Sequence, residues 1–307
     1  MTTGDERMKT LFVLLGSTGI GKTDLCLSIA DLLCCPIVNA DSRQIYRELP
    51  IGTAAPTLEQ QEHTRHYFVG THSLTQNYSA AQYGEDARQL LSHLFRQYDH
   101  LLLSGGSMLY IDTVCHGIDS LPTVDETTRQ LMKMRLESEG LPKLVEELKQ
   151  LDPVWAERVD IHNPRRVIHA LEICHITGQP YSSLIGRHKE KLPYRIIKIG
   201  LTRPREELYE RINQRVELMM KQGLEDEARR ALPFRQQNAL NTVGYKELFT
   251  YFDGQCTLEE AIEKIKSNTR AYARKQNTWF NHDGSIVWFN AEKKKEILAF
   301  VSDMIKA

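Results

Sequence analysis

The sequence predicts an α/β fold in which a parallel sheet flanked by helices is interrupted by an all-helical insertion. Strand-like apolar runs alternate with helical spacings over the first third of the chain, and this alternation is typical of a parallel sheet with helices on both faces. From residue 118 to 193 only helical spacing is found, and a strand-like run returns at 194–201. We therefore expect an α/β core at residues 8–117 and 194–307, with C-terminal helices, and a helical domain at residues 118–193.

Four strands are expected in the first third. The apolar run LFVLL (11–15) is followed by turn residues, as expected of a strand that is buried on both faces. The segment CPIVNAD gives a second short strand that ends at Asp41. Two further strands are expected at 66–69 (HYFV) and at 100–106 (HLLLSGG).

Helices are expected between and after these strands. Residues 23–33 have apolar side chains at helical spacing. A second helix is predicted at 79–98, with Ser79 as its N-cap. Another helix begins at about Met108. In the C-terminal part, which reads as helical, the long candidates are 206–232 and 258–280.

The charge, the apolar stretches and the cysteines of the chain limit the classes of protein to which it can belong. The net charge of −1 argues against a protein that binds nucleic acid over its whole surface, although Lys and Arg gather at 158–198 and 264–275. No apolar stretch is long enough to span a membrane, and the run at 11–15 is too short for a secretory signal. The six cysteines form no C-x-x-C pair, so we expect reduced thiols in a cytoplasmic protein.

A phosphate-binding loop follows the first strand. The segment GSTGIGKT fits the pattern G-x-x-x-x-G-K-[ST], which holds the phosphates of a nucleotide such as ATP or of another di- or triphosphate, and a strand before it and a helix after it support a P-loop NTPase-like sheet. Glycines let backbone N–H groups approach phosphate, the lysine adds a point charge, and the threonine hydroxyl is a usual Mg²⁺ ligand. The predicted phosphate-binding residues are Gly16, Ser17, Thr18, Gly19, Ile20, Gly21, Lys22 and Thr23, with Thr23 as the metal ligand.

The usual acidic partner of such a loop is missing from the sequence. The strand that should end in an ATPase aspartate ends in LLLSGG instead. The nearest carboxylate at the end of a strand is Asp41, which should face the same crevice as the loop. Asp41 could cap a turn there, act as a base or grip an acceptor. Two activities stay open at this point: a small-molecule kinase, or an enzyme whose loop holds a leaving group.

Eight segments, which span residues 11 to 280, resemble one family when taken in order. They are GSTGIGKT, NADSRQIYRELPIGTAAP, YSAAQY, LLLSGGSMLYIDTV, DPVWAERVDIHNPRRVIHALEICHITGQPYS, RINQRVELM, NTVGYKEL and TRAYARKQNTWF. Together they resemble the tRNA dimethylallyltransferases. This resemblance implies transfer of a dimethylallyl group from dimethylallyl diphosphate to the N6 amine of the adenosine directly 3′ of the anticodon, with release of diphosphate.

The resemblance also implies roles for single residues. The loop and a Mg²⁺ ion would hold the departing diphosphate, and Arg215 would reach it from the other side, with Leu208, Ile212 and Val216 packing the opposite face of its helix. Asp41 would act as the general base for the amine, and Ser107 would hydrogen-bond the amine or a phosphate. The catalytic residues expected are thus Asp41, Ser107 and Arg215.

The implied macromolecular partner is the anticodon stem-loop of tRNA, bound by a monomer that has no membrane segment. The target base would be turned out of its stack. The expected tRNA contacts are Asp41, Ser42, Arg43, Gln44, Ser107, Arg129, Arg165, Arg166, Val167, Ile168, His169, Asn241, Thr242, Val243, Gly244, Tyr245 and Lys246, together with the basic stretch at 264–275.

The sequence differs from the family pattern in two places, and two alternative functions are considered. Asn281 stands where many relatives have arginine, and no cysteine beyond Cys256 could form the zinc finger of eukaryotic members, which fits a bacterial-type enzyme. One rival is the related branch that prenylates free adenine nucleotides, which would not need a basic helical insertion. The other is a non-enzymatic RNA-binding protein that would not need Asp41.

Overall fold

The computed structural model describes residues 8–117, 121–122, 124–186 and 192–306. The chain divides into two compact units, Met1–Cys115 with Leu192–Ala307, and His116–Lys191. The predicted boundary at residue 118 lies outside the described residues.

A six-stranded sheet forms the centre of the first unit. All its neighbouring strands are parallel, which confirms the predicted α/β class. Every residue of the inner strand Thr10–Leu15 is buried, because helices cover a parallel sheet on both faces. In spatial order the strands are β3 (His66–Tyr67), β2 (Ile37–Asn39), β4 (His100–Gly105), β1 (Thr10–Leu15), β5 (Arg195–Thr202) and β6 (Ile286–Asn290).

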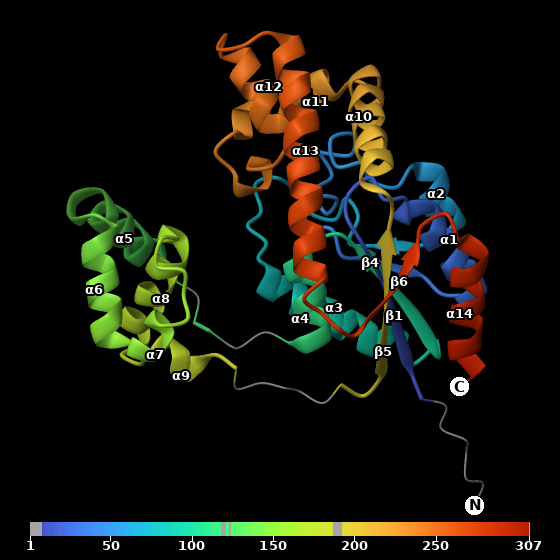
Figure 1. The fold of residues 1–307 in the computed structure, drawn as a ribbon, viewed down its shortest axis with the longest axis horizontal. Helices are drawn as coiled ribbons and strands as arrows, with labels where there is room; N and C mark the ends of the chain where they lie inside the picture. Colours follow the sequence, from blue (N-terminus) through green and yellow to red (C-terminus); the bar gives the residue numbers. More distant parts are fainter. Residues whose placement is uncertain (1–7, 118–120, 123, 187–191, 307) are drawn as a thin grey trace, which may run out of the picture. The chain divides into compact units, whose positions relative to one another are not determined.

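Helices lie on the two faces of this sheet. The first, α1 (Lys22–Leu33), packs beside α14 (Lys294–Lys306) on one face. On the other face lie α3 (Ala80–Leu94) and α4 (Met108–His116), while the short α2 (Leu58–His63) joins β2 to β3 (Figure 1). The side chain of Ser79 accepts a hydrogen bond from the backbone N–H of Gln82, which confirms its predicted capping role.

A second group of helices stands beyond the carboxyl ends of the strands (Figure 1). It has its own apolar core, centred on residues such as Leu248, Tyr245 and Ile265. Its members are α10 (Arg205–Lys221), α11 (Leu224–Ala231), η1 (Leu232–Phe234), η2 (Asn238–Leu240), α12 (Tyr245–Phe252) and α13 (Leu258–Phe280). Because parallel sheets bind ligands at their carboxyl ends, these helices are placed to enclose a site.

The second unit is entirely helical over its described residues. Met132, Leu144 and Leu171 are among the side chains of its core. The carboxylate of the fully buried Asp152 accepts hydrogen bonds from the backbone and hydroxyl of Ser182, at 2.6 and 2.7 Å, and so joins α7 to α9. Its helices are α5 (Glu126–Glu139), α6 (Leu141–Leu151), α7 (Pro153–Ala156), α8 (Pro164–Thr177) and α9 (Tyr181–Leu184).

The prediction for the C-terminal part was wrong in two places. The single helix expected at 206–232 is two helices, because Gly223 adopts the left-handed conformation with φ of 98° and ends the first. Residues 286–290 form an edge strand beside β5 rather than a helix. By contrast, the helix predicted at 258–280 has the predicted bounds. Among the described helices, none has both the length and the hydropathy required to cross a membrane.

Candidate active site

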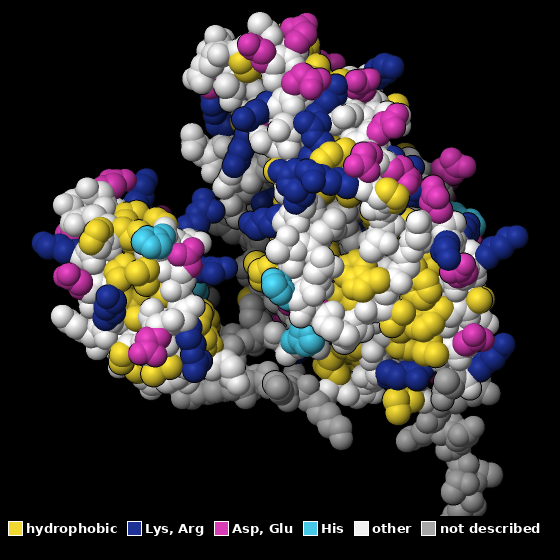
Figure 2. All heavy atoms as spheres, viewed as in Figure 1, with side chains coloured by type: hydrophobic (Ala, Val, Ile, Leu, Met, Phe, Trp, Pro, Cys, Tyr) yellow, Lys and Arg dark blue, Asp and Glu magenta, His cyan; other side chains and the backbone are white. Residues whose placement is uncertain are grey.

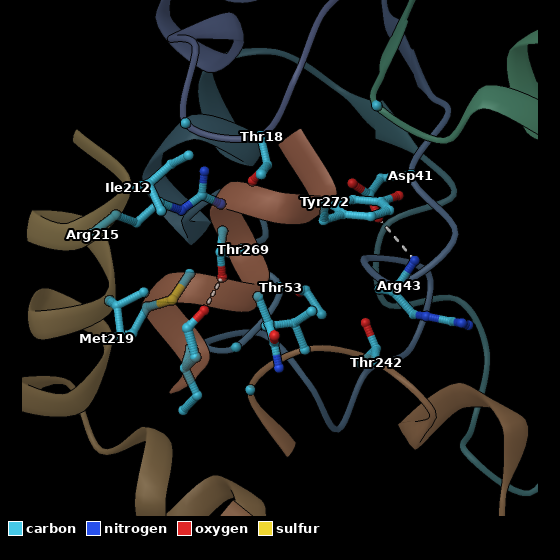
Figure 3. Close-up of a pocket in the computed structure, with 18 of the residues that line it drawn as sticks. Thr18, Asp41, Arg43, Thr53, Ile212, Arg215, Met219, Thr242, Thr269 and Tyr272 are labelled. Atoms are coloured by element: carbon cyan, nitrogen blue, oxygen red, sulfur yellow. Dashed lines mark hydrogen bonds between the residues drawn. The ribbon is translucent and has the colours of Figure 1, made fainter. Parts of the chain in front are cut away.

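A cavity of about 800 Å³ lies in the first unit, and we call it the central pocket. Its walls come from the phosphate loop, from the turn that follows β2, from the segment 241–247 and from helices α10 and α13. Figure 3 shows Thr18, Asp41, Arg215, Thr242 and Tyr272 around it. The topology thus brings together segments that are about 200 residues apart in the sequence.

The phosphate loop has the backbone geometry that its glycines predict. Gly19 has φ of 78°, and a Cβ atom added there would lie 2.8 Å from a side-chain carbon of Ile212. Gly21, with φ of 106°, is the N-cap of α1, so the free N–H groups of the first helical turn face the pocket. The ammonium of Lys22 donates hydrogen bonds to the carbonyls of Gly16 and Ser17, both at 2.9 Å.

Three side chains that the sequence analysis missed hold this loop in place. The amide of Gln276, on α13, accepts a hydrogen bond from the Thr18 N–H (2.9 Å) and donates one to the Gly106 carbonyl (2.7 Å). Gln276 is only 2% exposed. Arg211 and Arg203 donate to the carbonyls of Gly19 and Ile20, at 3.1 and 2.9 Å.

Lys22, Arg215 and Asp41 are among the charged residues that line the pocket. Burial lowers the pKa of Lys22 to about 8, although the carboxylate of Asp41 opposes the shift. Burial also lowers the pKa of Arg215, again against the effect of Asp41. In a partly desolvated site, a bound anion stabilises positive charges. Lys22 and Arg215 are therefore suited to hold a phosphate group.

The expectation that the apolar neighbours of Arg215 pack on the opposite face of α10 was wrong for Ile212 and Val216. Leu208, Ile212 and Val216 are buried as predicted. Ile212 and Val216, however, line the central pocket together with Arg215. A spacing of three or four residues along a helix places side chains on the same face, so α10 presents the guanidinium and an apolar wall to the same cavity.

Asp41 lies two residues beyond the end of β2 and lines the pocket. Its Oδ1 accepts hydrogen bonds from the backbone N–H groups of Arg43 (2.9 Å) and Gln44 (3.4 Å), so the carboxylate does cap a turn. The other oxygen, Oδ2, has no hydrogen-bond partner among the described residues. One carboxylate can therefore fix the turn and still offer an oxygen to a substrate proton.

Ser107 holds the 41–44 turn through hydrogen bonds to Ser42. Its hydroxyl accepts a hydrogen bond from the Ser42 N–H (2.7 Å) and donates one to the Ser42 hydroxyl (3.0 Å). Ser107 is 7% exposed and is not among the residues that line the central pocket. The nearby glycine at the end of β4, Gly105, lets the strand lie against the Ala40 carbonyl, since a Cβ atom there would be 2.2 Å from that oxygen. The structure thus gives Ser107 a contact with Ser42 rather than a place on the pocket wall.

Most of the predicted segment 241–246 faces the pocket. Asn241, Thr242, Val243, Gly244 and Lys246 line it. Tyr245 is fully buried, and its hydroxyl donates to the carboxylate of Glu227 at 2.7 Å. The expectation that the Tyr245 side chain contacts RNA was wrong, because the residue joins α12 to α11 instead.

The helical unit exposes some of its predicted RNA contacts, and Figure 2 shows both basic and acidic side chains on its visible face. The side chains of Arg129, Arg165 and Arg166 are exposed, and no carboxylate of a described residue forms an ion pair with them. Asn163 caps α8, so the two arginines stand on the first turn of that helix. Val167 is fully buried in the core of the unit, and the expectation of an RNA contact was wrong for its side chain.

The neighbours of these residues differ in exposure. Ile168 is half-buried against the core of the unit. His169 is exposed and lies 3.6 Å from Glu172.

Thr23, the predicted ligand of a magnesium ion, is one of the residues that line the pocket. Thr23 lies at the start of α1 and lines the pocket beside Asp24. Among the described residues, no group of three His, Cys, Asp or Glu side chains is placed to hold a metal. Mg²⁺ is commonly held by one or two protein oxygens together with substrate phosphates and water. The oxygens of Thr23 and Asp24 match this type of coordination.

Comparisons with known proteins agree with this geometry. The sequence model described as IPP transferase matches residues 44–283. A protein named tRNA dimethylallyltransferase 1 from Phocaeicola vulgatus is 58% identical over 292 residues, which are 95% of this chain and 97% of that protein. The crystal structure of the full-length tRNA isopentenylpyrophosphate transferase from Bacillus halodurans is 33% identical, covers 97% of both chains and superposes with a TM-score of 0.73.

A more distant structure shares the fold. It is a eukaryotic dimethylallyltransferase acting on tRNA, 24% identical, with a TM-score of 0.78 over 92% of this chain and 74% of that chain. The family model covers more than half of the chain, and the relatives match it over nearly its whole length. The chain therefore belongs to the IPP transferase family, the family of the tRNA dimethylallyltransferases.

Proposed function

We propose that the protein transfers the dimethylallyl group of dimethylallyl diphosphate to the N6 amine of the adenosine directly 3′ of the anticodon in tRNA. The observation that carries this proposal is the meeting of Lys22, Arg215 and Asp41 in one pocket beside the phosphate loop. The two cations and the loop suit a leaving diphosphate, and the carboxylate suits an amine that must lose a proton.

In the proposed step the bond between the allylic carbon and the bridging oxygen of the donor breaks, and the electron pair leaves with diphosphate. The N6 lone pair forms the new bond to that carbon, and the N6 proton passes to Asp41. Lys22, Arg215 and the N–H groups at the start of α1 stabilise the negative charge that develops on the diphosphate. A Mg²⁺ ion near Thr23 would supply further charge neutralisation on the phosphate oxygens.

The rest of the pocket suits the five-carbon group. Met219, Val216 and Ile265 lie on its walls, on α10 and α13. An allylic carbon that develops positive charge reacts with water unless water is kept away. We propose that these apolar side chains hold the dimethylallyl group and exclude water from it.

The proposal is tested by mass spectrometry of nucleosides. Unmodified tRNA is treated with the protein, Mg²⁺ and dimethylallyl diphosphate and then digested. We expect one adenosine per tRNA to gain a dimethylallyl group in place of one hydrogen, and ATP supplied without the prenyl donor to remain unconsumed. Turnover of ATP with no change in the prenyl donor would contradict the proposal and would favour a kinase.

A second expected result concerns the helical unit. We propose that Arg165 and Arg166 bind phosphates of the anticodon stem-loop. The double variant Arg165→Ala/Arg166→Ala should weaken RNA binding and lower the slope of log Kd against log salt by about one for each phosphate that the variant no longer binds. Fluorescence anisotropy with a labelled stem-loop at several salt concentrations measures this slope.

A matched control removes the same charge elsewhere on the unit. Lys143→Ala/Lys149→Ala takes two exposed lysines from α6. Its salt slope should stay near that of the wild type. If both double variants change the slope equally, the effect reports net charge alone, and the proposed contact is contradicted.

A further inference from the structure

Tyr272 is the one aromatic side chain among the described residues that line the central pocket. It lies on α13 between Thr269 and Gln276, both of which also line the pocket, so a helical face points the three side chains into the same space. Figure 3 shows the Tyr272 ring beside the carboxylate of Asp41.

The surroundings of Tyr272 are unlike those of a core tyrosine. Tyr83 and Tyr245 are fully buried, and each donates its hydroxyl to an acceptor. Tyr272 keeps 37% of its surface exposed. Burial, with the charge of Asp41 as the second cause, raises the pKa of the Tyr272 phenol to about 12. The Tyr272 side chain is uncharged and has exposed surface in the central pocket.

A base that is turned out of its stack loses its stacking contacts, and a flat side chain in the pocket can replace them. Enzymes that act on flipped bases commonly stack them on aromatic side chains and read their edges with polar groups. In the central pocket the aromatic surface and Asp41 lie side by side, so a purine on the ring would bring its exocyclic amine toward the carboxylate. The remaining lining side chains offer no second aromatic surface among the described residues.

We propose that the ring of Tyr272 is the stacking surface that receives the target adenine and orients its N6 amine toward Asp41. This inference rests on the proposed function and names the residue that positions the acceptor. The hydroxyl group is not required for stacking, so the role belongs to the ring.

Kinetic constants of three variants test the role of the ring. Tyr272→Phe keeps the aromatic ring, Tyr272→Leu removes it, and Phe234→Leu removes an aromatic ring of similar exposure, 38%, from η1 outside the pocket. For Tyr272→Leu we expect the KM for the RNA stem-loop to rise about tenfold to a hundredfold, with little change in the KM for dimethylallyl diphosphate. Tyr272→Phe and Phe234→Leu should stay within about threefold of the wild type.

A fluorescence measurement gives a readout that does not depend on activity. A stem-loop that carries 2-aminopurine at the target position is bound at saturating protein concentration. Stacking quenches 2-aminopurine, so the complex with Tyr272→Leu should be brighter than the complexes with the wild type, Tyr272→Phe and Phe234→Leu. Thermal melts of the four proteins check that the leucine variants are folded.

The outcomes separate this inference from the proposed function. An active wild type with equal KM and equal fluorescence in Tyr272→Leu would overturn the stacking role alone. A loss in Tyr272→Phe as large as in Tyr272→Leu would overturn it as well, because the hydroxyl would then be the working group. A wild type that alkylates no RNA would instead contradict the proposed function, and the fluorescence comparison would still report stacking.

Discussion

Replacing Asp41 by asparagine should lower kcat by about a hundredfold to ten-thousandfold, the range that general-base catalysis contributes. The amine of adenine is a poor nucleophile because its lone pair is shared with the ring. A carboxylate that takes the proton as the carbon–nitrogen bond forms removes this difficulty, and an amide cannot accept that proton. The KM values for donor and RNA should change little, since the shape of the side chain is kept.

Asparagine is the informative substitution because Asp41 has two tasks in this structure. Its Oδ1 accepts the N–H groups of Arg43 and Gln44, and an asparagine oxygen can accept them equally well. Asp41→Ala removes both the proposed base and this cap, so it should also raise the KM for RNA, because we propose that the 41–44 turn contacts RNA. Single-turnover rates at saturating RNA and donor measure the chemical step alone. A fall of about tenfold or less in Asp41→Asn would contradict the base role.

The parts of the site that are continuous in sequence could be predicted. The run at 11–15, the glycines of GSTGIGKT and Lys22 form one local unit, and their conformations follow from residue type. Asp41 could be placed at the pocket because strand ends share one edge of a parallel sheet. The resemblance to a family added the substrate, which no spacing in the sequence specifies.

The residues that the sequence analysis missed depend on tertiary contacts. Gln276 lies in a helical segment whose pattern resembles a solvated face, yet its amide contacts Thr18 and Gly106, which are 258 and 170 residues away in the sequence. A buried polar side chain of this kind has no periodicity of its own to reveal it. Tyr245 was misassigned because the whole segment 241–246 was expected to contact RNA, whereas the Tyr245 hydroxyl is paired with the buried Glu227. Its neighbours 241–244 do line the pocket.

The break between α10 and α11 could have been found. Gly223 interrupts an otherwise continuous helical pattern, and a glycine near the end of such a pattern is a common stop. The edge strand at 286–290 begins with four apolar and aromatic residues, IVWF, which fit a strand better than a helix. Both errors came from extending a helical interpretation past a signal that opposes it.

Removing the ammonium of Lys22 should be the other very damaging change. In Lys22→Ala we expect kcat/KM for dimethylallyl diphosphate to fall by about a hundredfold to a thousandfold, the loss typical of removing one preorganised donor to a developing anion. The defect should persist at saturating RNA, because we propose that the lysine contacts the donor rather than the acceptor. Steady-state rates at varied donor concentration measure it, and Lys293→Ala, which removes an exposed lysine outside the pocket, is the control.

The same lysine predicts a pH dependence whose sign follows from its pKa. Burial lowers the pKa of Lys22 to about 8, so the free enzyme loses this positive charge as the pH rises through that value. The value of kcat/KM for the donor reports the free enzyme and should therefore fall above pH 8. A bound diphosphate stabilises the ammonium, and kcat at saturating donor should stay level to higher pH. Lys22→Arg keeps a charge that does not titrate in this range, and it should abolish the alkaline fall even if its overall rate is lower. An unchanged alkaline fall in Lys22→Arg would assign the titration to another group, because the charge on residue 22 would then be constant while the rate still declines.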